Sequence, residues 1–362
     1  MNTNITVKYN GVPSYDITLA QDYTFLYREL NKLNTKERKI CIVTDSNLSK
    51  LYLNELIETV KDYAKVVETF TFPAGEDSKN LDTVYKLYER LIQSGFDRKD
   101  LLIALGGGVV GDLTGYGAAT YLRGINFIQM PTSLLAMVDS SIGGKTGVDF
   151  LAYKNMVGAF HQPKSVYMNL KTLLTLNDAQ FFSGFGEIIK HGLIKDREYY
   201  YWLKENRQLL IKRDINTLFD MIYKSCLIKR EVVEKDPKEL GDRALLNFGH
   251  TIGHAVEKLM EFKLLHGECV AVGMVAAGYL SWKRNHITEE DFSDLVNTLK
   301  EYHLPTTVSG IKAVDILKTA LHDKKMDAGQ IKFILLDEIG KAYMDTTVTE
   351  TEMLDAINYI LN

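Results

Sequence analysis

Short apolar runs alternate with amphipathic helical patterns along the first half of the chain. Runs of strand length occupy residues 39–44, 66–72, 101–105, 125–130 and 165–169, and apolar positions recur at helical spacing in residues 51–63, 81–93 and 109–122. Two earlier runs, residues 5–9 and 15–19, flank Asn10-Gly11, a dipeptide typical of a tight hairpin turn. This alternation predicts a mostly parallel sheet with helices on both faces.

The pattern changes after about residue 177. From residue 180 to about residue 284 the apolar positions follow long helical periods with few strand signals. Residues 331–336 and 341–346 are expected to form a small hairpin, and residues 349–361 a last helix. We therefore predict an α/β domain over residues 1–177, followed by a mainly α-helical domain over residues 178–362.

The composition narrows the class of protein. Of 362 residues, 46% are hydrophobic and 25% charged, with 43 Lys and Arg against 47 Asp and Glu, which is typical of a globular protein and predicts no nucleic-acid partner. The longest apolar run, residues 269–280, is shorter than a membrane span needs, and residues 1–11 do not form a secretory signal. Three widely spaced cysteines, Cys41, Cys226 and Cys269, favour a reducing, cytoplasmic environment.

A glycine-rich turn follows the run at residues 101–105. It reads Gly106-Gly107-Gly108-Val109-Val110-Gly111-Asp112 and leads into a helical pattern. Glycines let backbone N–H groups approach a phosphate, and a helix N-terminus favours negative charge. The spacing matches neither the G-x-G-x-x-G fingerprint nor a P-loop, so the alternatives are a phosphate site and a simple tight turn.

Asp45, at the end of an early strand, is open to two interpretations. An acidic residue there suits the ribose hydroxyls of a dinucleotide, and it equally suits a helix N-cap.

Residues 131–149 form the segment densest in polar chemistry. Small hydroxyl residues, Gly143-Gly144 and Lys145 are followed closely by Lys154 and Asn155. Hydroxyls, flexible glycines and lysines together suit a multiply anionic ligand. The alternative is a surface loop rich in turn-forming residues.

Three histidines and one glutamate have spacings that suit a metal ion. His250 and His254 share a helix face at i, i+4, His266 begins the next helical pattern, and Glu187 precedes Lys190 by three residues. Two imidazoles and a carboxylate make an open, zinc-type site. Structural histidines are the alternative, and the H-E-x-x-H pattern is absent because Thr251 stands where its glutamate would be.

The remaining histidines and several basic residues carry weaker signals. His161, His191, His286, His303 and His322 are scattered, and we interpret them as structural or solvated. Lys229, Arg243 and Lys324 are each either solvated charges or ligand-binding groups. Arg243 is the best candidate, because it precedes Asn247 by four residues and His250 by seven, and one helix face would carry all three.

Taken together, these motifs resemble those of 3-dehydroquinate synthase from residue 45 to about residue 325. The shared segments are residues 75–79, 106–112, 120–124, 131–133, 139–146, 154–155, 186–190, 246–254, 266–268 and 323–325. Several separate motifs make this resemblance far more specific than any one of them.

The resemblance implies a Rossmann-like N-terminal domain and a helical C-terminal domain, with the active site in the cleft between them. It implies that Glu187, His250 and His266 bind Zn²⁺ (or Co²⁺), and that His254 faces the substrate. The positions that match the family's NAD site are Asp45, Asn47, Glu76, Lys79, Gly107, Gly108, Val109, Asp112, Thr132, Ser133, Lys154 and Thr175. Those that match its substrate site are Arg123, Asp139, Lys145, Asn155, Lys190, Lys229, Arg243, Asn247, His254 and Lys324.

The family's reaction is also implied. It converts 3-deoxy-D-arabino-heptulosonate 7-phosphate to 3-dehydroquinate and phosphate in the shikimate pathway, through transient NAD-dependent oxidation, phosphate elimination, reduction and an intramolecular aldol closure. Arg123 matches a residue that reaches the substrate phosphate of a neighbouring subunit, so the resemblance implies a homodimer. Two positions match the family's pattern less closely. Asp149 stands where many members carry Asn, and both Lys324 and Lys325 match the family's substrate-binding lysine.

Three alternatives remain at this point. A related sugar-phosphate cyclase would use NAD, a metal ion and the same mechanism as 3-dehydroquinate synthase but act on a different substrate. An NAD- and metal-dependent polyol dehydrogenase would accumulate NADH and would not need residues 139–145. A catalytically silent nucleotide-binding module would not need Glu187, Lys190, His250 and His266 together.

Overall fold

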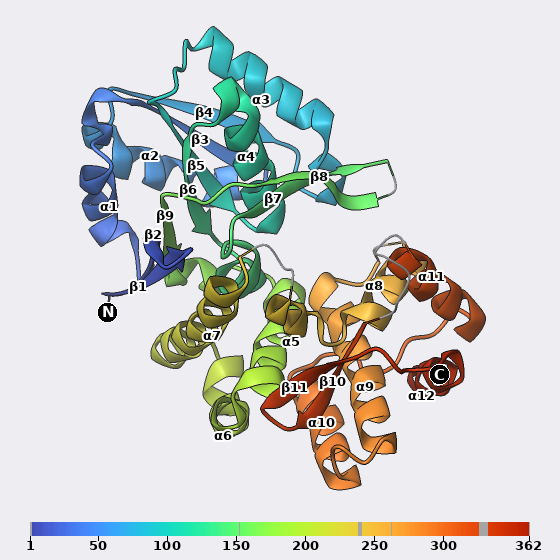
Figure 1. Cartoon of the computed structure of the whole chain (residues 1–362). Coiled ribbons are helices and arrows are strands. Elements are labelled where there is room, and N and C mark those ends of the chain that lie inside the picture. The colour runs from blue at the N-terminus through green and yellow to red at the C-terminus, as the bar shows by residue number, and fades with distance from the viewer. Residues whose placement is uncertain (1, 152, 238–240, 262, 326–331, 362) are drawn as a thin grey trace. The chain divides into compact units, whose positions relative to one another are not determined.

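The chain forms two compact units, Met1–Leu176 and Asn177–Asn362 (Figure 1). The computed structural model describes residues 2–151, 153–237, 241–261, 263–325 and 332–361. Each unit has its own core and is described here by itself.

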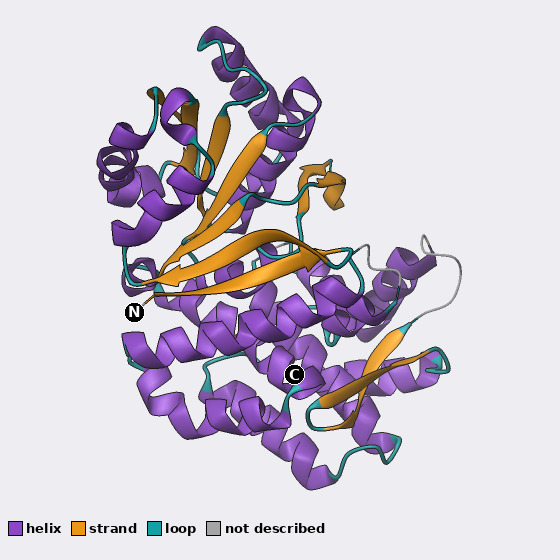
Figure 2. Cartoon of the chain, turned by 60° about the vertical axis from the view of Figure 1, so that its left-hand side comes forward, coloured by secondary structure: helices purple, strands orange, loops and turns teal. Residues whose placement is uncertain are grey.

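The first unit is built on a seven-stranded sheet with the order β1-β2-β9-β6-β5-β3-β4. Figure 2 draws the strands of the chain in orange. Its strands are β1 (Asn2–Tyr9), β2 (Val12–Ala20), β3 (Lys39–Asp45), β4 (Val66–Phe72), β5 (Leu101–Gly106), β6 (Asn126–Pro131) and β9 (Ser165–Asn169). Only β1 and β2 pair antiparallel, through a turn in which Asn10 and Gly11 both have positive φ angles. The predicted hairpin and the predicted parallel sheet are both confirmed.

Helices cover both faces of this sheet because successive strand residues point to opposite sides. Ile40 and Ile42 pack with α1 (Leu26–Lys32) and α2 (Asn54–Val60). Cys41 and Val43 pack with α3 (Leu81–Gln93) and α4 (Gly108–Thr120). The prediction of helices on both faces is confirmed.

A further hairpin, β7 (Lys145–Phe150) and β8 (Tyr153–Phe160), was not predicted. Its residues look like a loop in the sequence because they are rich in glycine and polar side chains, and most of β8 is exposed. The hairpin lies against α4, where a Cβ on Gly115 would come within 2.4 Å of the Thr146 side chain. It carries several of the predicted site residues.

The second unit is mainly helical, as predicted. Its helices are α5 (Asp178–Lys195), α6 (Arg197–Ile211), α7 (Ile215–Lys235), α8 (His250–Leu259), α9 (His266–Lys283), α10 (Glu289–Glu301), α11 (Ala313–Lys325) and α12 (Glu350–Ile360). Strands β10 (Phe333–Glu338) and β11 (Lys341–Asp345) form the expected small hairpin. Among the described residues, no helix has the length and apolar character needed to span a bilayer.

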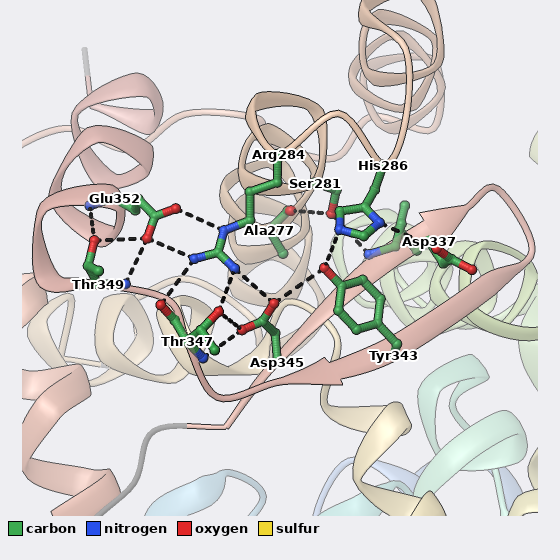
Figure 3. A network of polar contacts seen from close by, with 11 residues as sticks. Ala277, Ser281, Arg284, His286, Asp337, Tyr343, Asp345, Thr347, Thr349 and Glu352 are labelled. Atoms are coloured by element: carbon green, nitrogen blue, oxygen red, sulfur yellow. Dashed lines mark hydrogen bonds and ion pairs between the residues drawn. The ribbon is translucent and has the colours of Figure 1, made fainter.

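One arginine joins the hairpin to two helices of the second unit (Figure 3). Arg284, at the end of α9, donates to both carboxylate oxygens of Glu352 at 2.8 Å and to Asp345 Oδ2 at 2.8 Å. Glu352 also accepts from the backbone N–H and hydroxyl of Thr349, the N-cap of α12. Such bidentate, charge-assisted bonds fix the start of α12 against the end of β11.

Candidate functional site

The carboxyl ends of β3 and β5 mark the point where the strand order reverses. From β3 the chain continues outward to β4, and from β5 it continues in the other direction to β6. Ligands of open α/β sheets bind in the crevice outside such a switch point. Asp45 and the glycine turn, Gly106 to Gly108, end the two adjacent strands there.

The glycine turn brings two predicted segments together. A Cβ on Gly107 would lie 3.3 Å from Ser133 Oγ, and one on Gly108 would lie 3.3 Å from Ser140 Oγ. Thr132 donates its backbone N–H to Gly106 O at 3.0 Å. The N-terminus of α4 receives no side-chain cap among the described contacts, so its N–H groups and the serine hydroxyls face one region that suits a phosphate.

Asp45 caps the turn that follows β3. Its Oδ1 accepts from the backbone N–H groups of Asn47 at 2.8 Å and Leu48 at 3.0 Å. Asp45 is therefore a turn residue and not the N-cap of the helix that follows, whose N-cap is Leu48. A carboxylate at the end of β3 still offers the acceptor oxygens that suit a ribose hydroxyl.

Lys79, which is buried, is the centre of a charge cluster in the first unit. Its Nζ lies 2.7 Å from Asp112 Oδ2 and 4.0 Å from Glu76 Oε1, and Lys154 Nζ lies 3.6 Å from the same Glu76 oxygen. Burial opposes the charge of Lys79, but Asp112 and Glu76 outweigh it and raise the pKa of the ammonium group. Four predicted cofactor residues thus form one electrostatic unit.

Arg123 lies on an unusual turn after α4. Leu122, Arg123 and Gly124 have successive φ angles of 49°, 67° and 117°, and Arg123 is exposed. Arg98 Nε donates to Leu122 O at 3.1 Å. Two consecutive non-glycine residues in the left-handed region are strained, which is typical of functional positions.

Glu187 lies in the middle of α5, at its contact with α9. A Cβ on Gly186 would lie 2.4 Å from Gly267 O, and one on Gly267 would lie 1.8 Å from Ser183 O. Ser183 Oγ also accepts from Gly267 N–H at 3.1 Å. Because both glycines lack side chains, the residues beside them, Glu187 and His266, come close together.

Two imidazole rings meet at the Glu187 carboxylate. His250 Nε2 and His266 Nε2 each lie 3.7 Å from Glu187 Oε1. The other nitrogens have partners: His250 Nδ1 contacts Phe248 O at 3.2 Å, and His266 Nδ1 contacts Glu257 Oε2 at 3.4 Å. With Nδ1 bonded to these acceptors in both rings, the two Nε2 atoms point to the same region, as they do in metal-ligating histidines.

The charges around this group are tightly coupled. Burial alone would raise the pKa of Glu187, but Lys190 and the two histidines hold it well below its ordinary value. Burial and then Lys190 lower the pKa of His250, so this imidazole is neutral. For His266, burial is outweighed by Glu187 and Glu257, which raise its pKa to about 9.

A divalent metal ion fits these residues. Both carboxylate oxygens of Glu187 are buried without a hydrogen-bond partner, although Lys190 forms an ion pair with Oε2. The 3.7 Å spacings are near the separation of about 3.4 Å that ligand bonds of about 2.1 Å give at a tetrahedral angle. Nitrogens of His250, His254 and His266 also lie within 4.8 Å of one another, so the geometry leaves His254 close to the same point.

The second unit buries three cationic side chains. Lys190 is 1% exposed, Arg243 2% and Lys229 6%. Arg243 donates through Nη1 to Pro237 O at 2.9 Å. The interpretation of Lys229 and Arg243 as solvated charges is therefore wrong, and buried cations of this kind suit anionic ligands.

Comparison with known proteins agrees with this chemistry. The family model described as 3-dehydroquinate synthase N-terminal matches residues 69–183, and the one described as 3-dehydroquinate synthase C-terminal matches residues 184–326. The 3-dehydroquinate synthase of Acetivibrio thermocellus is 44% identical over 344 residues, covering 95% of each chain. The chain belongs to the 3-dehydroquinate synthase family. The enzyme of Ruminiclostridium cellulolyticum is 40% identical over 95% of each chain.

Solved structures place this family among the sugar-phosphate cyclases. A 2-epi-5-epi-valiolone synthase from Streptomyces hygroscopicus, with NAD⁺ and Zn²⁺ bound, has a TM-score of 0.89 at 26% identity, covering 96% of both chains. A 2-deoxy-scyllo-inosose synthase with carbaglucose-6-phosphate, NAD⁺ and Co²⁺ has a TM-score of 0.88 at 26% identity, covering 99% and 100%. A butanol dehydrogenase of Thermotoga maritima, 14% identical, shares the fold with a TM-score of 0.71.

The structure gives the secondary-structure position or contacts of further residues that match the family's site and that the sequence pattern did not place. Asp139 lies in a π-helical turn, residues 136–140, and Lys145 begins β7. Thr175 hydrogen-bonds to the Tyr52 hydroxyl and donates to Thr172 O at 3.1 Å. Lys324 is near the end of α11, and its side chain lies outside the described residues.

The prediction that Arg243, Asn247 and His250 share one helix face is wrong. Residues 242–247 form a 3₁₀ helix, and α8 begins separately at His250. Gly249, with a φ angle of 80°, separates the two and packs so closely on α9 that a Cβ would lie 2.8 Å from Val270 O. Tertiary packing of the glycine therefore overrides helix continuity.

Glu257 is the functional candidate that was missed. It is 5% exposed and contacts His266 Nδ1 from α8. The signal was present in the sequence, because Glu257 follows His250 by seven residues and His254 by three, on one face of the helix.

Proposed function

We propose that the chain converts 3-deoxy-D-arabino-heptulosonate 7-phosphate to 3-dehydroquinate and phosphate, with Glu187, His250 and His266 as metal ligands. The observation that carries the assignment of the ligands is the convergence of two imidazole Nε2 atoms on a buried, unsatisfied Glu187 oxygen. Relatives at 40% and 44% identity over nearly the whole chain support the reaction.

Residues of the first unit would hold NAD. When bound, NAD would supply a hydride acceptor and donor, and a metal held by Glu187, His250 and His266 would polarise the reacting hydroxyl. The glycine turn and Ser133 would hold the dinucleotide pyrophosphate, Asp45 a ribose, and Lys79 and Lys154 the remaining negative charge.

The substrate would be held by charge. Its phosphate and carboxylate need cations that are desolvated, because bonds between charged groups strengthen when water is excluded. Lys190, Lys229 and Arg243 offer three such groups in the second unit. Asn247 and the exposed His254 would contact the sugar hydroxyls from beside the metal ligands.

The assembly and location are further parts of this proposal. We infer a homodimer in which Arg123, exposed on its left-handed turn, reaches the substrate phosphate of the neighbouring subunit. The three cysteines are all free and buried, which supports a cytoplasmic location.

Phosphate release from this substrate tests the proposal, with and without NAD⁺ and with and without a chelator, while the NADH absorbance band is recorded. Release that requires both NAD⁺ and metal, without net NADH, is expected. A steady rise of NADH with a polyol would instead support a dehydrogenase. Faster release from a sugar phosphate that lacks the carboxylate would support a related cyclase.

A further inference from the structure

Three residues of the first unit form a closed ring of hydrogen bonds. Asp149 N–H donates to Lys79 O at 2.7 Å, Asn155 N–H donates to Asp149 Oδ1 at 2.8 Å, and Lys79 Nζ donates to Asn155 Oδ1 at 2.5 Å. The ring joins the segment before α3 to both strands of the β7–β8 hairpin. Each residue both donates to one neighbour and accepts from the other.

The ring closes at an irregularity of the hairpin. Val148 pairs with Val157 and Phe150 pairs with Tyr153, so the single residue Asp149 faces a longer stretch, residues 154–156. Bulges of this kind re-aim side chains and occur next to active sites. The bulged stretch contains Lys154 and Asn155, which match the family's cofactor and substrate residues.

Asn155 adopts a conformation that needs support. Its φ angle is 54°, in the left-handed region, which asparagine tolerates better than most residues but which still costs free energy. The carboxylate of Asp149 accepts the backbone N–H of Asn155 and so stabilises this turn. The same turn directs the Asn155 side chain to Lys79.

Lys79 connects the ring to the charge cluster. Its ammonium group contacts Asn155 Oδ1, Asp112 and Glu76, and Glu76 in turn contacts Lys154. The position of Asn155 therefore affects the position of Lys79, and the reverse also holds. Burial raises the pKa of Asp149, which is consistent with a carboxylate enclosed by this cluster.

We propose that Asp149 is a positioning residue that couples the dinucleotide site to the substrate site by fixing the positions of Asn155 and Lys79 relative to each other. The inference rests on the proposed function, because that function gives Lys79 to NAD, and Asn155 matches a substrate residue of the same family. The competing possibility is that Asp149 only stabilises the hairpin.

The test measures KM for NAD⁺ and for the substrate separately. Asp149→Ala removes the acceptor and is expected to raise both KM values about tenfold, the loss expected for one hydrogen bond. Asp149→Asn keeps a carbonyl acceptor and is expected to restore most of this loss. Asp97→Ala is the control, because Asp97 Oδ1 also accepts a backbone N–H, that of Lys99 at 2.7 Å, in the loop before β5.

The outcomes distinguish a positioning role of Asp149 from a role in the stability of the fold alone. Wild-type KM values in Asp149→Ala, with or without a lower melting temperature, would overturn the proposal. If Asp149→Ala does not fold, Asp149→Glu, which displaces the acceptor by one methylene, should raise both KM values severalfold, and unchanged values would likewise overturn it.

Two further measurements identify which idea has failed. Asp149→Ala and Asn155→Ala should combine non-additively in a double-mutant cycle, since both act on Lys79; additive effects would overturn the coupling. If the wild-type chain releases no phosphate, the proposed function has failed, and NADH titration of Asp149→Ala against wild type still tests the ring.

Discussion

Gly186 and Gly267 meet backbone to backbone, so closely that a Cβ on Gly186 would lie 2.4 Å from Gly267 O. Each glycine is next to a predicted metal ligand, Glu187 or His266. The close approach of α5 and α9 therefore sets the distance between a carboxylate and an imidazole that are far apart in the sequence.

Gly267→Ala should separate these helices. The added methyl group would overlap Ser183 O, a backbone atom that cannot rotate away, and the expected cost is about 2–3 kcal/mol of unfolding free energy. Metal affinity should fall as well. Urea denaturation and competition with a chromogenic chelator measure the two effects. Gly278→Ala, on the same helix, is the control, because the three atoms nearest to its added methyl group would be side-chain atoms of Leu295 and Phe292 at 3.2 Å or more. Equal losses in both variants would contradict this account.

Glu257→Gln should weaken metal binding without removing a ligand. Glu257 accepts from His266 Nδ1 and so fixes the ring that offers Nε2. Loss of such an outer carboxylate typically lowers metal affinity about 10- to 100-fold. Glu261→Gln provides a comparison on the same segment, since its side chain is 79% exposed. A metal dissociation constant unchanged from wild type would remove Glu257 from the site.

Lys79→Met should destabilise the first unit and reduce NAD⁺ affinity. It leaves Asp112 buried without its cation, and breaking a buried ion pair typically costs about 3–5 kcal/mol. The double variant Lys79→Met, Asp112→Leu should regain stability but not NAD⁺ binding. Lys171→Met is the control, because the Lys171 side chain is 57% exposed and its pair with Asp22 is worth less than about 1 kcal/mol. Recovery of NAD⁺ binding in the double variant would show that Lys79 acts only through stability.

The Arg284–Glu352 contact should make the second unit sensitive to acid. Arg284 lowers the pKa of Glu352 from 4.5 to about 2. Because the folded pKa is the lower one, the stabilisation is complete above pH 4.5 and is lost as pH falls toward 2. Glu352 is 35% exposed, so screening reduces the contribution to about 1–2 kcal/mol. Urea unfolding of wild type and Glu352→Gln between pH 7 and 3 should converge in acid. A difference that does not depend on pH would refute this account.

Arg123 can be tested by mixing two inactive variants. If it reaches a neighbouring site, Arg123→Ala and Glu187→Gln subunits should form heterodimers with one complete site. Random mixing would then restore about a quarter of wild-type activity. No recovery in heterodimers isolated with two affinity tags would mean that Arg123 acts within its own subunit.

The sequence predicted the fold well because periodicity reports burial directly. Strand β4 and helix α3 have the predicted bounds, and Asn10-Gly11 makes the predicted turn. The β7–β8 hairpin was missed because its residues are rich in glycine and polar side chains and carry no alternating apolar pattern, although residues 146–148 are buried.

The candidate site was only partly accessible from residue types. Spacing brought His250 and His254 onto one helix, but the burial of Arg243 and Lys229 comes from tertiary packing that no local pattern contains. Gly249 interrupts the helix expected through Arg243 for the same reason, since its position is set by contact with α9.

The strand order also constrains how the chain is made. The β1–β2 hairpin joins the sheet only through β9, which begins at Ser165. At a synthesis rate of about 5–20 residues per second, the hairpin is made roughly seven to thirty seconds before its partner strand exists. During that interval the free edge of β2 is a template for wrong pairing. Yield in the cell should therefore depend on chaperones that shield nascent strands more than on the final stability of the sheet.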